Sequence, residues 1–377
     1  MSPRIAVVGA GPAGLYTAWS VRRLLPGAEV TVWEQQASGD SGGFGVVFSR
    51  SALDGIAQRD PDLVWGIDAA GESFTSLRLI MRGAHNSQEV PGFVAVARSR
   101  LLEMLRHRCV RAGVQLNLGQ SAPPPSVLSA ASDVVVIADG VSSTSRDSLG
   151  RFGTHSAEVG TPYAWLGADR SFEGLTFAVH DSPHGPFVVH AYPYAPNRST
   201  FIVEIGGPDP VAAGVSAPGE PTTPDTAALE RLLADSLRGG RLIADRSRWR
   251  RFRSLHNETW WSDNIVLVGD AAHTTHYSIG SGTKLAMDDA AVLAEALAGE
   301  DSVRRAFLGY EEARMPVVTK AQHVAERSRR WFADIADVLP NSPADVLRSL
   351  ATRGGTVGSR DLLLGDGLRR PAALTDA

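Results

Sequence analysis

A glycine-rich segment near the N-terminus has the spacing of a dinucleotide-binding turn. It reads Gly9-Ala10-Gly11-Pro12-Ala13-Gly14 and directly follows a β-branched apolar run at residues 4–8. Glycine at the first position permits a tight turn, at the second it lets the backbone approach a pyrophosphate, and at the third it lets helix and strand pack closely. The start of the next helix adds free N–H groups and a positive dipole. The sequence therefore predicts a nucleotide phosphate site at Gly9, Gly11, Ala13 and Gly14.

An acidic residue stands where such a site needs one. The helix expected over residues 15–25 is followed by an apolar strand at residues 29–33, and that strand ends in Glu34. A carboxylate about 20 residues after the glycine motif accepts hydrogen bonds from a ribose diol. These features predict a bound nucleotide, but they do not distinguish NAD from FAD.

Two further motifs each follow a short apolar run that predicts a buried strand. Residues 134–138 lead into Asp139-Gly140-Val141-Ser142-Ser143-Thr144-Ser145-Arg146, and residues 265–268 lead into Gly269-Asp270-Ala271-Ala272-His273. A glycine turn, Gly280-Ser281-Gly282-Thr283-Lys284, then opens a helix expected to run to about residue 298. Taken alone, Asp, Gly and Ser at the first of these motifs also suit an ordinary polar turn.

In this order, the three motifs resemble those of the single-component FAD-dependent aromatic monooxygenases. The resemblance implies that FAD is the bound nucleotide and that Asp270 binds the ribityl chain. It implies further cofactor contacts at Arg98, Asp139, Arg146, Gly269, Gly280, Gly282, Thr283 and Lys284. The chemistry agrees, because a carboxylate accepts from ribityl hydroxyls and a positive helix end stabilises negative charge on a reduced flavin. For Arg98 the alternative is an exposed arginine at a helix start.

Three segments are similar to one branch of that family. The first is the string of residues 276–286, which begins His276-Tyr277-Ser278-Ile279-Gly280. The second is His190-Ala191-Tyr192-Pro193-Tyr194, followed by Ser199-Thr200-Phe201-Ile202-Val203-Glu204, and the third is Ser328-Arg329-Arg330-Trp331-Phe332. They resemble the salicyloyl-CoA 5-hydroxylases, the 2-aminobenzoyl-CoA monooxygenases and the tryptophan hydroxylase of violacein biosynthesis. The resemblance implies that NAD(P)H and O2 are consumed to hydroxylate an electron-rich aromatic ring. The first expectation is a hydroxy- or aminobenzoyl thioester on coenzyme A or a carrier protein, and the alternative is tryptophan, an indole or another free aromatic.

The segment between residues 161 and 206 alternates in polarity and predicts an antiparallel sheet with one face toward a cavity. In the family, such a sheet faces the isoalloxazine. We therefore expect His190, Tyr277 and His276 as candidate catalytic groups that take a proton from the substrate, and Tyr192 and Tyr194 as substrate contacts. The alternative is that His190, Tyr192 and Tyr194 are merely half-buried residues of the sheet, with no part in binding or catalysis.

A basic run interrupts an otherwise slightly acidic chain. It consists of Arg246, Arg248, Arg250, Arg251 and Arg253. Such a run could meet the phosphates of coenzyme A, the phosphate of NADPH or an acidic carrier protein. Runs of like charge usually form a solvent-exposed face of a strand or helix, and we expect the same of these arginines.

Composition narrows the class of protein. The chain has 377 residues, 43% of them hydrophobic, a net charge of −4 and the single cysteine Cys109. The charge argues against general nucleic-acid binding, and one cysteine allows no internal disulfide, which suits the cytoplasm. There is no leader-like segment and no apolar run long enough for a membrane span. The ten histidines have no Cys partners and no helical His pair, so no metal is expected.

The expected fold is α/β, with a Rossmann-type FAD-binding lobe, an antiparallel-sheet substrate domain and C-terminal helices, like p-hydroxybenzoate hydroxylase. The FAD-binding lobe is expected to combine residues 1–71, 98–160 and 255–300. The substrate domain is expected to combine residues 72–97 and 161–254. Residues 301–377 are expected to form a helical segment, broken once at Pro316, and a tail.

Overall fold

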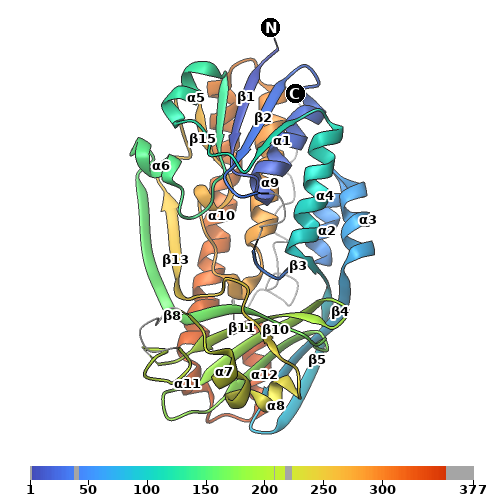
Figure 1. The fold of residues 1–377 in the computed structure, drawn as a ribbon, viewed down its shortest axis with the longest axis vertical. Helices are drawn as coiled ribbons and strands as arrows, with labels where there is room; N and C mark the ends of the chain where they lie inside the picture. Colours follow the sequence, from blue (N-terminus) through green and yellow to red (C-terminus); the bar gives the residue numbers. More distant parts are fainter. Residues whose placement is uncertain (1, 38–41, 208, 217–222, 354–377) are drawn as a thin grey trace, which may run out of the picture.

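The computed structural model describes residues 2–37, 42–207, 209–216 and 223–353 of the chain. They form two lobes, each built on one sheet, with a long ribbon and long helices running between them (Figure 1). The end of the expected C-terminal segment, residues 354–377, lies outside the described residues.

The upper lobe is built on a six-stranded sheet. Its order is β14 (Trp261–Ser262), β15 (Ile265–Leu267), β7 (Val134–Ile137), β1 (Arg4–Val8), β2 (Glu29–Glu34) and β6 (Gln115–Leu118). All neighbours are parallel except β14 and β15. Val7, Val135 and Val266 have no exposed surface, because helices cover both faces of a parallel sheet.

Helices surround this sheet and fill the space below it. They are α1 (Pro12–Leu24), α2 (Arg50–Ala57), α3 (Pro61–Ala70), α4 (Arg98–Arg111), α5 (Pro125–Ala131), α6 (Thr144–Leu149), α9 (Gly282–Gly299) and α10 (Val303–Ala333). Two short 3-10 turns, η1 (Gly269–Ala271) and η2 (Tyr277–Ile279), precede α9. Helix α1 packs against both α4 and α9, so the glycine motif at its start is held between distant parts of the chain.

The lower lobe is built on a nine-stranded, mainly antiparallel sheet. Eight strands follow the order β12 (Leu242–Ile243), β8 (Thr154–Ala168), β11 (Arg198–Ile205), β10 (Phe187–Ala195), β9 (Leu175–His180), β4 (Glu72–Met81), β5 (Ala84–Ala97) and β3 (Gly45–Ser49). The ninth, β13 (Trp249–Asn257), pairs with β8. Short helices complete the lobe, namely α7 (Thr226–Leu232), α8 (Ala234–Leu237), α11 (Ile335–Val338) and α12 (Pro343–Thr352).

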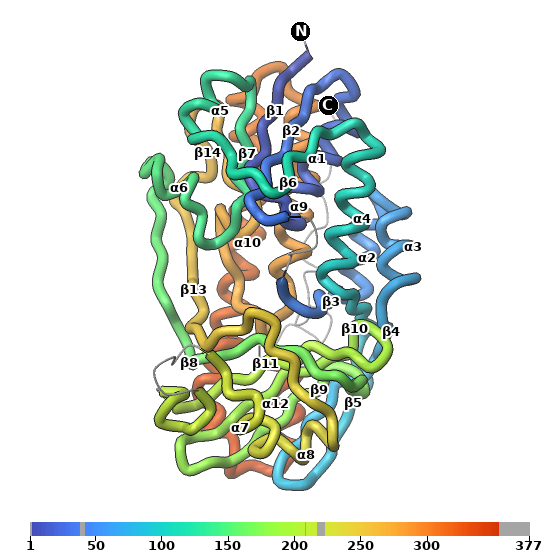
Figure 2. Tube along the Cα trace, in the orientation of Figure 1, coloured from blue at the N-terminus to red at the C-terminus, as the bar shows by residue number. Residues whose placement is uncertain are grey.

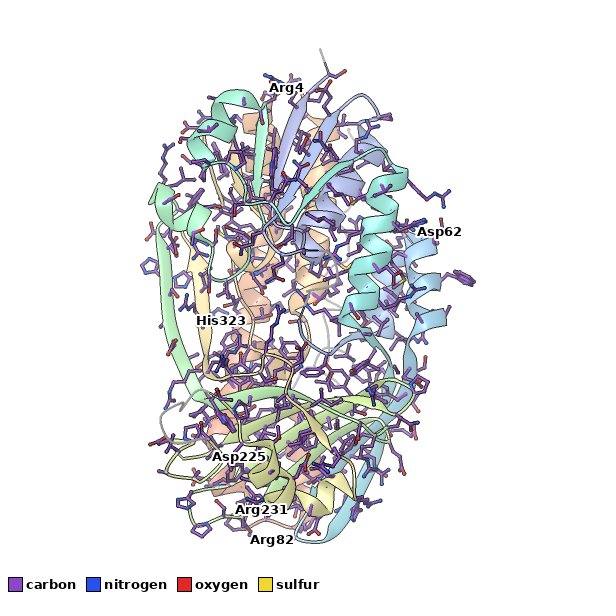
Figure 3. All side chains as sticks on the ribbon, viewed as in Figure 1. Arg4, Asp62, Arg82, Asp225, Arg231 and His323 are labelled. Atoms are coloured by element: carbon purple, nitrogen blue, oxygen red, sulfur yellow. The ribbon has the colours of Figure 1, made fainter. Side chains whose placement is uncertain are left out.

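The two lobes are joined by the ribbon of β8 and β13. Both strands leave the lower sheet and run up one side of the molecule toward the upper lobe (Figures 1 and 2). Charged side chains such as those of Arg4, Asp62 and Arg82 lie at the periphery (Figure 3). None of the helices among the described residues has the length and apolar character needed to cross a bilayer.

The predicted α/β class, with a Rossmann-type lobe, a second antiparallel sheet and C-terminal helices, is confirmed. The predicted break at Pro316 is wrong, because α10 continues through it without interruption. A proline inside a helix removes one backbone hydrogen bond and crowds the preceding turn, a cost that packing must offset if the helix is to continue. Arg314 and Val318, on either side of Pro316, are both buried, and this packing keeps the helix continuous.

Candidate active site

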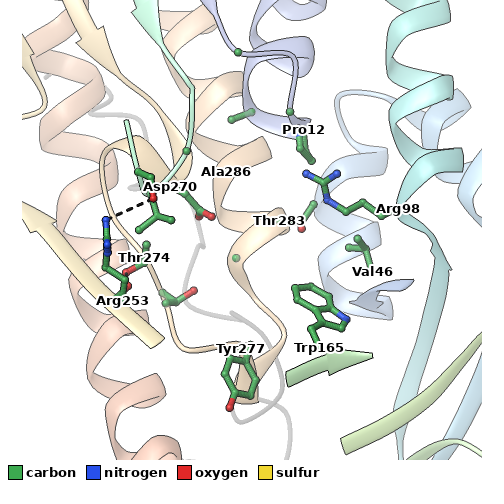
Figure 4. Close-up of a pocket in the computed structure, with 18 of the residues that line it drawn as sticks. Pro12, Val46, Arg98, Trp165, Arg253, Asp270, Thr274, Tyr277, Thr283 and Ala286 are labelled. Carbon is green, nitrogen blue, oxygen red and sulfur yellow. Dashed lines mark hydrogen bonds between the residues drawn. The ribbon is translucent and has the colours of Figure 1, made fainter. Parts of the chain in front are cut away.

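A cavity of about 950 Å³ lies between the two lobes. One end is bordered by the glycine motif after β1 and by the loops after β2 and β7. The other end is bordered by aromatic residues of β8, β9 and β10 and by the turn before α9 (Figure 4). Sites of this kind, between lobes and beyond the carboxyl ends of parallel strands, are where α/β proteins bind their ligands.

The glycine motif is shaped to receive a phosphate. Gly9 has a φ of +100°, and a Cβ on it would lie 2.4 Å from the carbonyl oxygen of Ala138. A Cβ on Gly14 would lie 1.9 Å from the carbonyl oxygen of Gly9, so helix and strand are in close contact. A Cβ on Gly11 would meet no protein atom within 4 Å, and this residue borders the cavity with Ala13. The free space at Gly11 is therefore on the side open to a ligand.

Glu34 is held in place at the same end. Its Oε2 accepts from the backbone N–H of Ala10 and its Oε1 from that of Gln36, both at 2.9 Å. The carboxylate borders the cavity and each oxygen keeps further acceptor capacity, as a ribose diol requires.

The segment after β7 supplies a polar wall. Asp139 borders the cavity, and its Oδ1 is buried without a hydrogen-bond partner among the described residues. A bound ligand that donates a hydrogen bond would satisfy this oxygen. Arg146 is buried and does not border the cavity. It donates to the carbonyl oxygens of Ala271 and Val141, both at 3.1 Å, and so joins this segment to η1.

Asp270 and Arg98 project into the middle of the cavity from opposite walls (Figure 4). Enclosure by protein raises the pKa of Asp270, although His273 and Arg98 act to lower it. The backbone N–H of Gly269 donates to the buried Asp289, whose other contacts, His273 Nε2 and Arg314 Nε, lie 2.7 Å away. Asp289, His273 and Arg314 therefore hold the turn that carries Gly269 and Asp270.

The N-terminus of α9 is open toward the cavity. Gly280, Gly282 and Thr283 border the cavity, and no side chain caps the helix at Ser281. Its first backbone N–H groups are thus available to a flavin carbonyl. Lys284 forms an ion pair with Asp288 one turn along the helix and does not border the cavity. Together with the polar groups described above, this free helix end fits FAD.

Aromatic side chains line the far end of the cavity. They belong to Tyr163, Trp165, Phe177, His190, Tyr192 and Tyr277. The hydroxyl of Tyr192 donates to the carbonyl oxygen of Gly45 at 2.8 Å. Tyr194 also packs against Gly45, but it does not border the cavity. This end is thus an aromatic chamber, whose ring faces suit stacking or edge contacts with an aromatic ligand.

A buried carboxylate, Glu204 on β11, lies behind the chamber. Its Oε1 is 2.8 Å from Nε2 of His190, a charge contact rather than an aligned hydrogen bond. Thr161 donates to its other oxygen at 3.0 Å, and the phenol of Tyr277 adds to the stabilisation of this carboxylate. Burial alone would raise the pKa of Glu204, but His190 and Tyr277 lower it to about 2. Burial and the Glu204 charge raise the pKa of Tyr277, so this phenol stays neutral and donates.

His276 lies next to this group but does not border the cavity. Its Nδ1 accepts from the backbone N–H of Ser278 at 3.4 Å and therefore caps η2. Burial lowers the pKa of His276 to about 4, although the Glu204 charge acts to raise it. The neutral ring holds the turn that carries Tyr277.

The last described residue, Arg353, supports the same turn. Its Nη2 donates to the carbonyl oxygen of Ser278 at 2.7 Å and its Nε to Ser328 at 2.9 Å. Its guanidinium lies 5.3 Å from the ring centres of both Phe177 and Phe332. Burial lowers its pKa to about 10, so it remains a cation at neutral pH.

Sequence reasoning assigned no role to Glu204, Asp289 or Arg353. Of these, only Glu204 gave a sequence signal, as an acid near the end of the apolar strand β11, in a segment that resembles the family. The arginine run was expected to be a solvated face, yet Arg250, Arg251 and Arg253 all border the cavity.

Comparison with known proteins establishes the family. A family model described as an FAD binding domain matches residues 128–325, and one described as an NAD(P)-binding Rossmann-like domain matches residues 7–44. The 3-hydroxy-4-methyl-anthranilyl-[aryl-carrier protein] 5-monooxygenase of Streptosporangium sibiricum is 42% identical, over 95% of this chain and 96% of its own length. The chain belongs to the FAD-dependent aromatic monooxygenases. The predicted family and the predicted FAD cofactor are thereby confirmed.

Further matches agree with this monooxygenase family. The salicyloyl-CoA 5-hydroxylase of a Streptomyces species is 38% identical, over 87% of this chain and 65% of its own length. Among solved structures, 2-methyl-3-hydroxypyridine-5-carboxylic acid oxygenase matches with a TM-score of 0.72 and 20% identity, covering 94% of this chain and 96% of that one. This last likeness shows the fold. As in other members, NAD(P)H and O2 are the co-substrates of the flavin reaction.

Proposed function

We propose that this monooxygenase hydroxylates the ring of a hydroxy- or aminobenzoyl thioester. The observation that carries the proposal is the group of Glu204, His190 and Tyr277 at the aromatic end of the cavity, close to the open N-terminus of α9. Oxygenation of an aromatic ring by a flavin needs an electron-donating hydroxyl or amino group on that ring. Such a donor releases more electron density as it loses its proton, so a nearby proton acceptor favours the reaction.

The residues of the chamber have distinct parts in this proposal. Bound FAD supplies the oxidation of NAD(P)H and the activation of O2. His190 takes the proton of the ring donor, and the ionised Glu204 stabilises the imidazolium that results. Tyr277 orients Glu204 and forms part of the wall with Tyr163, whose ring centre lies 4.5 Å from its own. The aromatic walls exclude water, which protects the oxygenating species from unproductive decay.

The thioester part of the proposal is supported by similarity. The two relatives are named for an anthranilyl group on an aryl-carrier protein and for a salicyloyl group on coenzyme A. Both are benzoyl groups with an amino or hydroxyl donor. The supply of NAD(P)H and of acyl thioesters, and the buried free thiol of Cys109, support the cytoplasm as its location.

The test is NAD(P)H oxidation by the FAD-loaded protein with salicyloyl-CoA, 2-aminobenzoyl-CoA, the two free acids and tryptophan, each supplied in turn. Products are identified by mass. A thioester product heavier by one oxygen, with the free acids inert, is the expected result. Oxygenation of tryptophan or a free acid, with the thioesters inert, would overturn the thioester assignment and favour the free-aromatic alternative.

A further inference from the structure

We propose that Arg250, flanked by Arg248 and Arg251, binds the phosphate of a 4′-phosphopantetheine arm that carries the acyl group. This inference rests on the proposed function, because that arm is the part shared by coenzyme A and carrier proteins when they hold an acyl thioester. The site lies on β13, in the ribbon that forms one wall of the cavity.

The direction of the side chains follows from the strand. Trp249 is buried in the core of the lower lobe, where its Nε1 donates to the carbonyl oxygen of Val215 at 3.2 Å. Side chains alternate along a strand, so Arg250 points away from that core, and Arg248 directly precedes the strand. Both are exposed, and Arg250 borders the cavity.

The pairing of β13 with β8 is irregular beside Arg251. Arg250 is paired with Tyr163, and Phe252 is paired with Val159, so three residues of β8, 160–162, lie opposite Arg251 alone. The extra residues therefore belong to β8, and such an irregularity bends the ribbon and increases its local twist. In this part of the ribbon, four consecutive residues, 250–253, border the cavity, where a regular strand would present only every second one.

The charge at this point is not neutralised by the protein. Within the described part of the chain, neither Arg250 nor Arg251 forms an ion pair, and Arg251 donates only to the carbonyl oxygen of Gly160. Arg253, in contrast, lies across the ribbon from Glu158 and reaches Ser142, so we leave it out of the site. Guanidinium groups bind phosphate through paired N–H donors, and two of them on a cavity wall suit a phosphate group.

The position also suits the arm that the phosphate would anchor. Tyr163, the partner of Arg250 in the ribbon, contacts Tyr277 in the aromatic chamber. A phosphate at Arg250 is therefore one strand away from the chamber, and the flexible arm could enter it while the phosphate stays at the wall.

Binding of the arm itself tests the proposal without catalysis. We would titrate the FAD-loaded protein with 4′-phosphopantetheine and with pantetheine, which differ only in the phosphate, by calorimetry. We expect the phosphorylated form to bind about tenfold more tightly, as charge-assisted hydrogen bonds imply. Arg250→Gln should abolish that difference, and Arg250→Lys should keep part of it because the charge remains. Arg305→Gln is the control, since Arg305 is an exposed arginine of α10 that forms an ion pair with Asp301.

Each other outcome has a clear meaning. Equal affinity for the two compounds, or a phosphate preference that survives Arg250→Gln, would overturn the site even if thioesters are hydroxylated. An Arg250→Gln variant that raises only the KM for NAD(P)H would also overturn it, because the arginine would then serve the nicotinamide coenzyme. Acyl-CoA and acyl-carrier protein assayed side by side identify the source of the arm. Failure of every thioester as a substrate would refute the proposed function, while the calorimetry would still decide the phosphate site.

Discussion

Oε1 of Glu204 lies 2.8 Å from Nε2 of His190, and both side chains are almost completely buried. Burial of a carboxylate is costly unless it is paired, and here His190, Tyr277 and Thr161 together offset that cost. The result is a negative charge held immediately behind the aromatic chamber. Every group that contacts it is either a candidate for proton transfer or fixes the orientation of one.

Replacing Glu204 with glutamine keeps the size of the side chain and removes its charge. We expect Glu204→Gln to lower kcat by roughly 10²-fold, the scale of a lost general-base contribution, while FAD stays bound. Steady-state rates, product yield and the pH profile of kcat measure the effect. Thr161→Val removes only the 3.0 Å hydrogen bond to the same carboxylate and should cost less than about tenfold. Equal losses in the two variants would contradict a role for the charge.

Replacing Gly9 or Gly11 of the nucleotide motif with a larger residue should have different effects on stability and on FAD binding. A Cβ at position 11 would have no protein atom within 4 Å, and the residue borders the cavity, so Gly11→Val should fold normally and bind FAD about 10- to 100-fold more weakly. Gly9→Val places its side chain against the carbonyl of Ala138 and should destabilise the apoprotein itself. Fluorescence titration with FAD and thermal unfolding of the apoproteins separate the two effects. Equal melting losses in both variants would show that Gly11 does not face the ligand.

The low pKa of His276 predicts a pH dependence of stability. Burial lowers this pKa from its usual value near 6.5 to about 4, so between these values the unfolded chain binds a proton that the folded protein excludes. The stability is fully present above about pH 6.5 and is lost as the pH falls toward 4. Between pH 7 and pH 5 this amounts to about 2 kcal/mol.

Urea unfolding at the two pH values measures this effect. His276→Asn should remove the slope that this residue contributes. His107→Asn, at an exposed position on α4, should keep the wild-type slope. If wild type and His276→Asn lost the same stability between pH 7 and pH 5, protonation of His276 would not be the cause.

Arg353 should affect both stability and the use of NAD(P)H. Arg353→Met keeps much of the volume but leaves the carbonyl oxygen of Ser278 without its donor, at a cost of about 1–3 kcal/mol. We expect a looser turn before α9, and therefore less product per NAD(P)H consumed and more hydrogen peroxide. Arg348→Met is the control, on the helix α12 that precedes Arg353, since among the described residues that exposed arginine pairs with Asp345 alone. Unchanged coupling in Arg353→Met would show that this anchor has no influence on the chamber.

The parts of the site that sequence reasoning could predict are local in the chain. The glycine motif and Glu34 belong to one strand-helix-strand unit, and Asp270 and the turn before α9 are close in sequence. Their residue types are fixed by backbone geometry that few other residues adopt, which makes them recognisable without a structure.

The parts that were missed depend on distant pairings. Glu204 becomes significant only because β10 and β11 are paired, with His190 opposite Ile202. Arg353 directly follows α12, the last described helix, and no local pattern connects it with Ser278. The arginine run was interpreted from its charge alone, and the irregular pairing with β8 opposite Arg251 cannot be recognised from the run itself. Such relationships arise from tertiary contacts, which spacing along the chain does not encode.

The order of strands in the upper sheet has a consequence for how the enzyme is made. β7 lies between β1 and β15, so strands from the beginning, the middle and the late part of the chain must meet before the sheet is complete. Pairings of such high contact order form late and slowly. A chain still under synthesis therefore has the glycine motif without Asp270 or the α9 terminus. Chains that end before α9 would lack part of the flavin site, and every chain long enough to include that site also includes β8 to β11, which line the chamber.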